Sequence, residues 1–172
     1  MRDDARYAML AIPNTEVKYI YRNTVMNWFD HTIQTWNLQP FYQALENYDT
    51  DTMEQMLTEF LSETISFYDY GENYYHGFLT GLLKGSGKYI VKSNRENGLG
   101  RSDLILRTPS IRGRAFVIEV KIASCFSEME RKCNDALTQI KDMKYCDELK
   151  AEGFQNIHPY GICFWKKEAM VR

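Results

Sequence analysis

The sequence predicts an α/β domain whose core runs in the order helix, three strands, helix, strand. Three observations predict this order. Apolar residues recur at helical spacing after Gly71, β-forming residues dominate three short segments from Lys88 onward, and a second helical segment ends near Gly153 before one more strand-like segment. At 172 residues the chain is long enough for one domain with a substantial core and a small helical appendage.

The first part of the chain is acidic and largely helical. Residues 7–12 are typical of a short strand, which stops at a Pro-Asn pair. Helical spacing of apolar residues follows in three segments, over 16–36, 41–47 and 53–65. We interpret residues 1–67 as a helical lead-in that packs on the core and residues 68–172 as the main domain.

The elements of the main domain follow in order from Gly71. A helix of about a dozen residues begins there, and Gly85 is placed to end it. Glu72 and His76 are four residues apart and therefore share one side of this helix. Turn-forming stretches then separate three predicted strands, at 89–94, 102–107 and 115–123. One long helix over 128–150 and a strand over 159–167 complete the predicted core.

Basic residues are concentrated where the three strands are predicted. Residues 1–83 carry 4 Lys/Arg and 12 Asp/Glu, a net charge of −8, whereas residues 84–121 carry 9 and 3, a net charge of +6. Residues 122–172 carry 8 of each. A local basic surplus is what a phosphate-binding surface needs, and solvated lysines and arginines on hairpin strands explain it equally well.

Three charged residues interrupt the strands: Asp103, Glu119 and Lys121. Strand side chains alternate between faces, so Glu119 and Lys121 point to one face while Ile118 and Val120 point to the other. Asp103 begins the preceding strand, and neighbouring strands lie about 5 Å apart, so a favourable register brings its carboxylate toward that of Glu119. Two adjacent carboxylates repel each other unless one is protonated or both share a cation.

Mg²⁺ suits such a pair of carboxylates. It takes oxygen ligands, keeps several waters, and is commonly held by one or two carboxylates plus a substrate phosphate. Lys121 would then orient or activate a water, or offset the negative charge of a phosphoryl transition state. A vestigial site and a surface ion-pair cluster are the competing interpretations of the same three residues.

Several segments, taken in order, resemble the PD-(D/E)XK nuclease superfamily: GENYYHGFLTGLL, KSNRENGLGRSDLIL, FVIEVK and ALTQIKDMKY. More narrowly, they are similar to a bacterial branch found at the C-terminus of AAA-ATPase-like proteins. The upstream AMLAIPNTEVKYIY is similar to the linker strand that joins the two regions in that branch. The resemblance implies a restriction-endonuclease-like αβββαβ core with a mixed sheet flanked by helices.

The resemblance also implies roles for individual residues. Asp103 matches the metal-binding acid of the PD element, and Glu119 and Lys121 match the acid and lysine of (D/E)XK. Glu72 matches an acid that the first core helix contributes, and Gln139 matches the glutamine of a QxxxY element. The implied catalytic set is therefore Glu72, Asp103, Glu119, Lys121 and Gln139, with Asp103 and Glu119 as metal ligands.

The QxxxY pattern has a tyrosine four residues after its glutamine. At that position this sequence has Met143, and Tyr145 follows two residues later. His76 and Arg101 belong to motifs of the narrower branch.

Four residues of the basic segment are candidates for contact with nucleic-acid phosphates: Lys92, Asn94, Arg95 and Arg101. A turn that carries solvated arginines is the competing interpretation. For His76, packing or hydrogen bonding is favoured over metal ligation. For Glu72, a helix-start acid is the alternative to a catalytic role.

The predicted function is a metal-dependent nuclease that hydrolyses DNA, with Mg²⁺ as cofactor and Mn²⁺ as a substitute. RNA as substrate, a homodimer, and an AAA-ATPase-like region of the same or another chain as partner are all compatible with the resemblance. The alternatives are a catalytically silent nucleic-acid-binding domain and a regulatory domain of an AAA-ATPase-like protein. The end at Val171-Arg172 is consistent with a fragment of a longer protein.

The start of the chain lacks the basic segment and long apolar run of a secretory signal, so we expect a cytoplasmic protein. The four cysteines show no CxxC spacing and are expected to be reduced thiols rather than zinc ligands.

Overall fold

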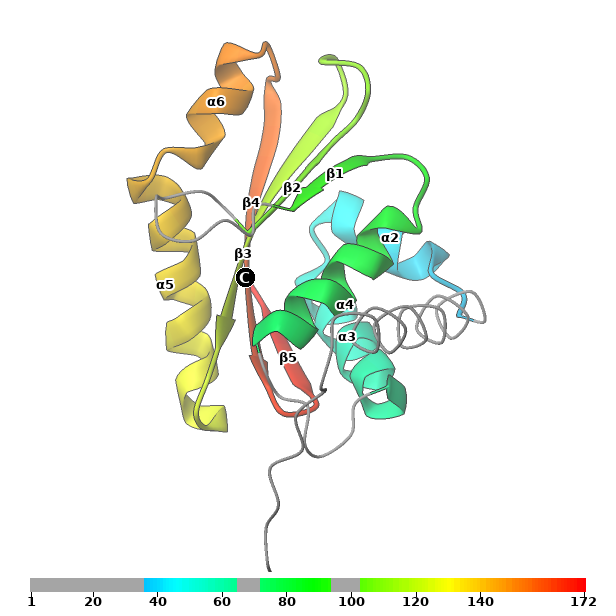
Figure 1. Ribbon diagram of the computed structural model, residues 1–172, viewed down its shortest axis with the longest axis vertical. Coiled ribbons are helices and arrows are strands. Elements are labelled where there is room, and N and C mark those ends of the chain that lie inside the picture. Colours follow the sequence, from blue (N-terminus) through cyan, green and yellow to red (C-terminus); the bar gives the residue numbers. More distant parts are fainter. Residues whose placement is uncertain (1–35, 65–71, 94–102) are drawn as a thin grey trace, which may run out of the picture. The chain divides into compact units, whose positions relative to one another are not determined.

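The computed structural model describes residues 36–64, 72–93 and 103–172, all of which belong to one compact unit (Figure 1). Its helices are α2 (Gln39–Asn47), α3 (Thr50–Thr64), α4 (Glu72–Lys84), the short 3₁₀-helix η1 (Phe126–Glu128), α5 (Met129–Asp142) and α6 (Tyr145–Ala151). Its strands are β1 (Ile90–Ser93), β2 (Leu104–Arg107), β3 (Arg114–Ile122), β4 (Asn156–Trp165) and β5 (Glu168–Val171). The predicted α/β class and the order of the core elements are confirmed.

The five strands form one mixed sheet in the order β1-β2-β3-β4-β5. Neighbours are antiparallel except β3 and β4, which are parallel and joined by way of α5. In this parallel pair Glu119 lies beside Gly161, and Lys121 lies beside Cys163. β3 is therefore the central strand of the sheet: β4 pairs along its whole length, whereas β2 pairs with its first half and ends just before Glu119.

Helices cover both faces of the sheet, with α5 and α6 on one face and α2, α3 and α4 on the other (Figure 1). Ala115 and Val117 of β3 pack in a buried cluster with side chains of α5 and α6. Phe116 points the other way and contacts the ring of Tyr160, whose hydroxyl donates to the carbonyl oxygen of Leu45 in α2 at 2.8 Å. Because β3 is buried on both faces, any charge on it must be paired or bound.

The expected single helix over 128–150 was wrong. The structure ends α5 at Asp142 and starts α6 at Tyr145, because Lys144 adopts a left-handed conformation with φ of 54°. The change of direction lets Tyr145 and Leu149 bury their side chains against Ala115 and Val117 of the sheet. Burial of these two side chains favours the break, although lysine is not a residue that signals a left-handed position.

The expected last strand over 159–167 was partly wrong. The structure starts β4 earlier, at Asn156, and folds the following residues back as β5. The outer edge of β5 is covered by α3: the main-chain N–H of Ala169 donates to Thr58 Oγ1 at 3.1 Å, and that of Val171 donates to Glu54 Oε1 at 2.9 Å. Side chains of α3 thus replace the missing neighbouring strand on this edge.

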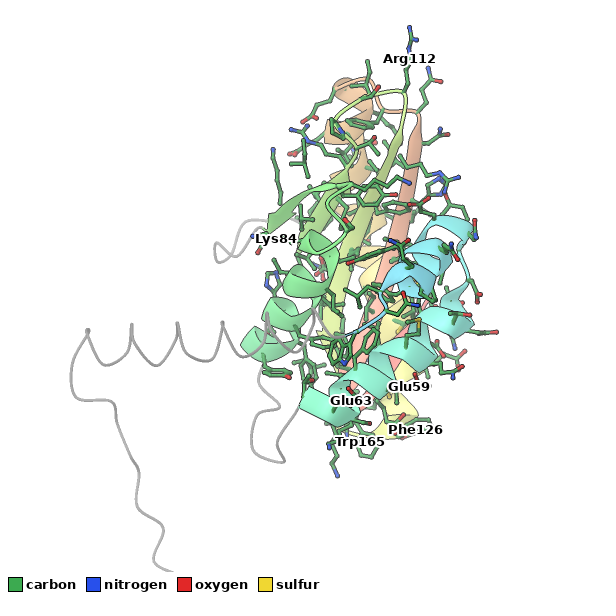
Figure 2. The ribbon with its side chains drawn as sticks, turned by 90° about the vertical axis from the view of Figure 1, so that its right-hand side faces the viewer. Glu59, Glu63, Lys84, Arg112, Phe126 and Trp165 are labelled. Atoms are coloured by element: carbon green, nitrogen blue, oxygen red, sulfur yellow. The ribbon has the colours of Figure 1, made fainter. Side chains whose placement is uncertain are left out.

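The two ends of the sheet differ in chemistry (Figure 2). Arg112, in the turn between β2 and β3, extends at one end, whereas Phe126 and Trp165 lie at the other. The rings of Phe126 and Trp165 contact each other with centroids 6.0 Å apart. β3 therefore runs from a basic turn toward an aromatic end.

No helix within the described ranges is long and apolar enough to cross a membrane. The four cysteines are free thiols, as expected, with Cys133 and Cys163 buried and Cys125 exposed. The described part of the fold therefore depends on packing and hydrogen bonds rather than on disulfides.

Gly161 provides a test of how closely α5 lies on the sheet. A Cβ at this position would stand 2.4 Å from the carbonyl oxygen of Cys133 in α5, so Gly161→Ala must push the helix away from β4. We expect a loss of about 1–3 kcal/mol in the free energy of unfolding, measured in urea.

Gly77→Ala is the matched control, because Gly77 is exposed in α4 and a Cβ there meets nothing within 4 Å. It should stabilise the protein by about 0.5–1 kcal/mol, since alanine is the better helix former. An equally mild effect of Gly161→Ala would contradict the close approach of α5 to β4.

Candidate functional site

Asp103 stands immediately before β2 and is tied to β3 through its side chain. The last paired residues of β2 and β3 are Leu104 and Ile118, so the next residues along the same register are Asp103 and Glu119. Asp103 Oδ2 accepts a hydrogen bond from the main-chain N–H of Val120 at 2.8 Å. The register is thus the one that brings the two carboxylates to neighbouring positions, as the sequence alone could only suggest.

Glu119 lies in the interior, with only 3% of its surface exposed. Its Oε1 accepts hydrogen bonds from Lys121 Nζ at 3.0 Å and from Gln139 Nε2 at 2.5 Å. Its Oε2 is buried and has no hydrogen-bond partner among the described residues. One oxygen of a buried carboxylate is therefore left without a donor, an arrangement that is costly in a folded protein.

Burial, chiefly, raises the pKa of Glu119 above its ordinary value, because a carboxylate removed from water is less stable in its charged form. The nearby carboxylate of Asp103 raises this pKa further, whereas the ammonium group of Lys121 acts in the opposite direction. A cation bound to the free oxygen of Glu119 would relieve both the burial penalty and the repulsion from Asp103.

Lys121 is held at the site by Gln139 of α5. Lys121 Nζ donates to Gln139 Oε1 at 2.5 Å in addition to its ion pair with Glu119. The side chain of Lys121 is 26% exposed, whereas that of Glu119 is 4% exposed. The ammonium group therefore lies at the boundary between the buried carboxylate and solvent, and α5 fixes its position.

Tyr145 enters this network although its spacing from Gln139 does not match the QxxxY pattern. Its hydroxyl lies 3.5 Å from Gln139 Nε2, at the long limit of a hydrogen bond. Met143, at the expected tyrosine position, is exposed instead. The left-handed turn at Lys144 makes the difference, because it turns Tyr145 back toward the sheet. The sequence shows Tyr145 two residues beyond the QxxxY position, but its contact with Gln139 depends on the turn at Lys144, which the sequence does not indicate.

Helix α4 brings His76 to the site. His76 is buried, and its Nε2 lies 3.2 Å from the main-chain carbonyl oxygen of Asp103. Glu72, the first residue of α4, is exposed, and within the described ranges no hydrogen bond or ion pair joins it to Asp103, Glu119 or Lys121. A catalytic role for Glu72 therefore stays a prediction.

Only one of the four candidates for phosphate contact lies within the described residues. Lys92 is exposed in β1, in register with Ile105 of β2. The other three candidates, Asn94, Arg95 and Arg101, lie outside the described residues. Their roles stay predictions.

The donor set of the site fits a hard divalent cation. Asp103 Oδ1 and Glu119 Oε2 are the two carboxylate oxygens to which no described residue donates a hydrogen bond. Within the described parts of the chain, no group of three or more His, Cys, Asp or Glu side chains is arranged to hold a metal. Two carboxylates are nevertheless enough for Mg²⁺, which takes its remaining oxygens from water and substrate phosphate.

Glu119→Gln tests the electrostatic cost of this site in the metal-free protein. The amide removes the buried negative charge and keeps an oxygen toward Lys121 and Gln139. Because the pKa of Glu119 is higher in the folded state, protonation of Glu119 stabilises the fold relative to the unfolded chain. This contribution to the unfolding free energy is complete below the unfolded-state pKa and is lost as the pH rises through the folded-state pKa. We therefore expect Glu119→Gln to gain roughly 1 kcal/mol in unfolding free energy at alkaline pH, with a smaller gain in acid.

The exposed Glu130 of α5 supplies the control, since Glu130→Gln should change the unfolding free energy little at any pH. Chemical unfolding in the presence of a chelator measures both variants. A loss of stability in Glu119→Gln at alkaline pH would contradict the description of Glu119 as a destabilising buried charge.

Comparison with known proteins adds one match. A sequence model of the PD-(D/E)XK nuclease superfamily matches residues 70–172, more than half of the chain. No curated protein and no solved structure matches the chain. The matched region contains the whole sheet, together with Asp103, Glu119, Lys121 and Gln139. With its mixed sheet flanked by helices and its paired carboxylates beside a lysine, the chain belongs to the PD-(D/E)XK nuclease superfamily.

Proposed function

We propose that the chain is a metal-dependent nuclease that hydrolyses DNA phosphodiester bonds with an activated water. One observation carries the proposal: Glu119 is a buried carboxylate with an oxygen to which no described residue donates, next to the carboxylate of Asp103 and the ammonium group of Lys121. A structural ion pair would engage both oxygens, whereas a cation site leaves one free.

Asp103 and Glu119 are the residues that would hold Mg²⁺, or Mn²⁺ in its place. A bound divalent cation supplies positive charge for the phosphate and lowers the pKa of water, so that hydroxide is available near neutral pH. The chain contributes the position of the two oxygens: Val120 N–H holds Oδ2 of Asp103, and Lys121 and Gln139 hold Oε1 of Glu119. In each carboxylate the second oxygen stays available.

Lys121 is proposed to stabilise the negative charge that develops on the phosphate as the phosphodiester bond breaks. Its Nζ carries up to three donors, of which Glu119 and Gln139 engage two. The third can point to a phosphate oxygen or to the attacking water. Gln139 is proposed to keep Lys121 in place during this step, and Glu72 to orient water from the start of α4.

DNA is the proposed substrate, with RNA as the alternative. The segment 84–121, which contains the acidic pair, has a net charge of +6, and this charge would offset the repulsion between phosphates and the acidic remainder of the chain. Lys92, Asn94, Arg95 and Arg101 are proposed as phosphate contacts.

Resemblance to the branch found C-terminal to AAA-ATPase-like regions supports a bacterial, cytoplasmic protein. It also supports an AAA-ATPase-like region, in the same or another chain, as the partner. A homodimer is a further proposal of the same kind. A catalytically silent binding or regulatory domain is the alternative function, and the presence of Asp103, Glu119 and Lys121 together argues against it.

Asp103→Asn tests the nuclease and its site together. The amide oxygen can still accept from Val120 N–H, so the β2–β3 connection is kept while the negative charge is lost. We expect wild type to cleave labelled single- or double-stranded DNA with Mg²⁺ or Mn²⁺, and the variant to lose at least about 100-fold in rate and most of its Mn²⁺ affinity.

Asp147→Asn, prepared identically, is the matched control, because Asp147 is an exposed acid whose ion-pair partner among the described residues is Lys150, on the same helix α6. It should cleave like wild type. Equal cleavage by all three proteins would indicate a contaminating nuclease, and Mn²⁺ binding without any cleavage would favour the silent alternative.

Lys121→Met separates catalysis from metal binding. Removing the ammonium group should slow cleavage by about 10²–10⁴-fold, the usual contribution of a group that assists proton transfer or stabilises transition-state charge. Mn²⁺ should still bind at alkaline pH, where Glu119 is ionised even without Lys121. Lys141→Met, on the exposed face of α5, controls for loss of a positive charge. Cleavage at the wild-type rate by Lys121→Met would remove Lys121 from the mechanism.

A further inference from the structure

His76 is a buried polar residue that the proposed mechanism does not use. It lies in the middle of α4, with only 7% of its surface exposed. On the same helix, the side chains of Tyr75, Phe78 and Leu79 are almost fully buried. An apolar residue would satisfy packing at this position, so the imidazole needs another reason to be there.

The contacts of His76 supply that reason. Its Nε2 lies 3.2 Å from the main-chain carbonyl oxygen of Asp103 and 3.5 Å from Ser93 Oγ at the end of β1. A carbonyl oxygen only accepts hydrogen bonds, so Nε2 must carry the hydrogen. An Nε2 that donates in this way has no free lone pair, so this nitrogen cannot also bind a cation.

Asp103 needs such a donor because it stands just outside the strand ladder. The last pair between β1 and β2 joins Ser93 to Leu104, so the carbonyl group of Asp103 lies one residue beyond that pair. Its carboxylate is fixed from the other side, by Val120 N–H of β3. Asp103 is therefore held at two points, by α4 through its backbone and by β3 through its side chain.

We propose that His76 is a positioning residue, whose Nε2–H holds the backbone of Asp103 so that its carboxylate stays bound to Val120 N–H and directed toward Glu119. For its effect on metal binding this inference rests on the proposed function. The contact itself belongs to the metal-free protein, so it can be tested there first.

The first experiment follows amide hydrogen exchange by NMR in the metal-free protein. His76→Leu keeps the side chain apolar and buried but removes the donor, and His76→Gln restores an N–H near the position of Nε2. In His76→Leu the amide of Val120, whose hydrogen-bond partner is Asp103 and not His76, should exchange roughly five- to tenfold faster, the factor implied by loss of one hydrogen bond. His76→Gln should bring its rate back toward that of wild type.

Leu106, in the middle of β2, is the reference amide and should exchange at an unchanged rate. A uniform increase at Val120 and Leu106 would reduce His76 to a general packing residue and overturn the inference. An unchanged rate at Val120 would overturn it as well. The NMR signals of the imidazole nitrogens give an independent readout. The chain has three histidines, and the signals that disappear in His76→Gln are those of His76. In wild type these signals must show hydrogen on Nε2. Hydrogen on Nδ1 would overturn the proposal.

The second experiment measures Mn²⁺ binding and DNA cleavage by the same variants. His76→Leu should need about 10-fold more Mn²⁺ for half-maximal cleavage, the usual effect of removing a group that orients a ligand, and His76→Gln less. If wild type neither binds Mn²⁺ nor cleaves, the proposed function fails, while the exchange data still decide the role of His76. If wild type binds Mn²⁺ and cleaves DNA, and His76→Leu does so at the same Mn²⁺ concentration, the positioning role of His76 is wrong while the proposed nuclease function stands.

Discussion

The buried carboxylate of Glu119 is the constraint on which the rest of the site depends. It lies in the central strand of a sheet that helices cover on both faces, where an ionised group is unfavourable unless other groups compensate its charge. Lys121 and Gln139 donate hydrogen bonds to one of its oxygens, Oε1. The other oxygen has no donor among the described residues, and this unpartnered oxygen is what supports the proposed cation.

The topology of the sheet explains how distant segments meet at this carboxylate. The antiparallel register of β2 and β3 sets Asp103 next to Glu119, and the parallel connection from β3 to β4 lays α5 across the same face. Gly161 of β4 lies beside Glu119 and lets α5 approach closely enough for Gln139 to reach Lys121. A fold with another crossover would leave Glu119 buried without these partners.

Stability and function oppose each other at this site. Burial and the charge of Asp103 raise the pKa of Glu119, so the arrangement that is proposed to bind a cation also destabilises the metal-free protein. His76 and Val120 belong to this balance, because they hold Asp103 close to Glu119 despite the repulsion between them. Surrounding hydrogen bonds thus maintain a carboxylate pair that would separate in water.

The sequence by itself determined the α/β class, the order of the core elements, and the shared face of Glu119 and Lys121. These features follow from local periodicity, because alternation along a strand and apolar spacing along a helix can be read from neighbouring residues. Only the tertiary structure decided the break at Lys144, the strand β5, the contact of Tyr145 with Gln139, and the bonds that hold Asp103. The bonds of Asp103 join groups far apart in the chain. The other three features lie between near neighbours, but they depend on packing against distant elements, the sheet for Tyr145 and α3 for β5.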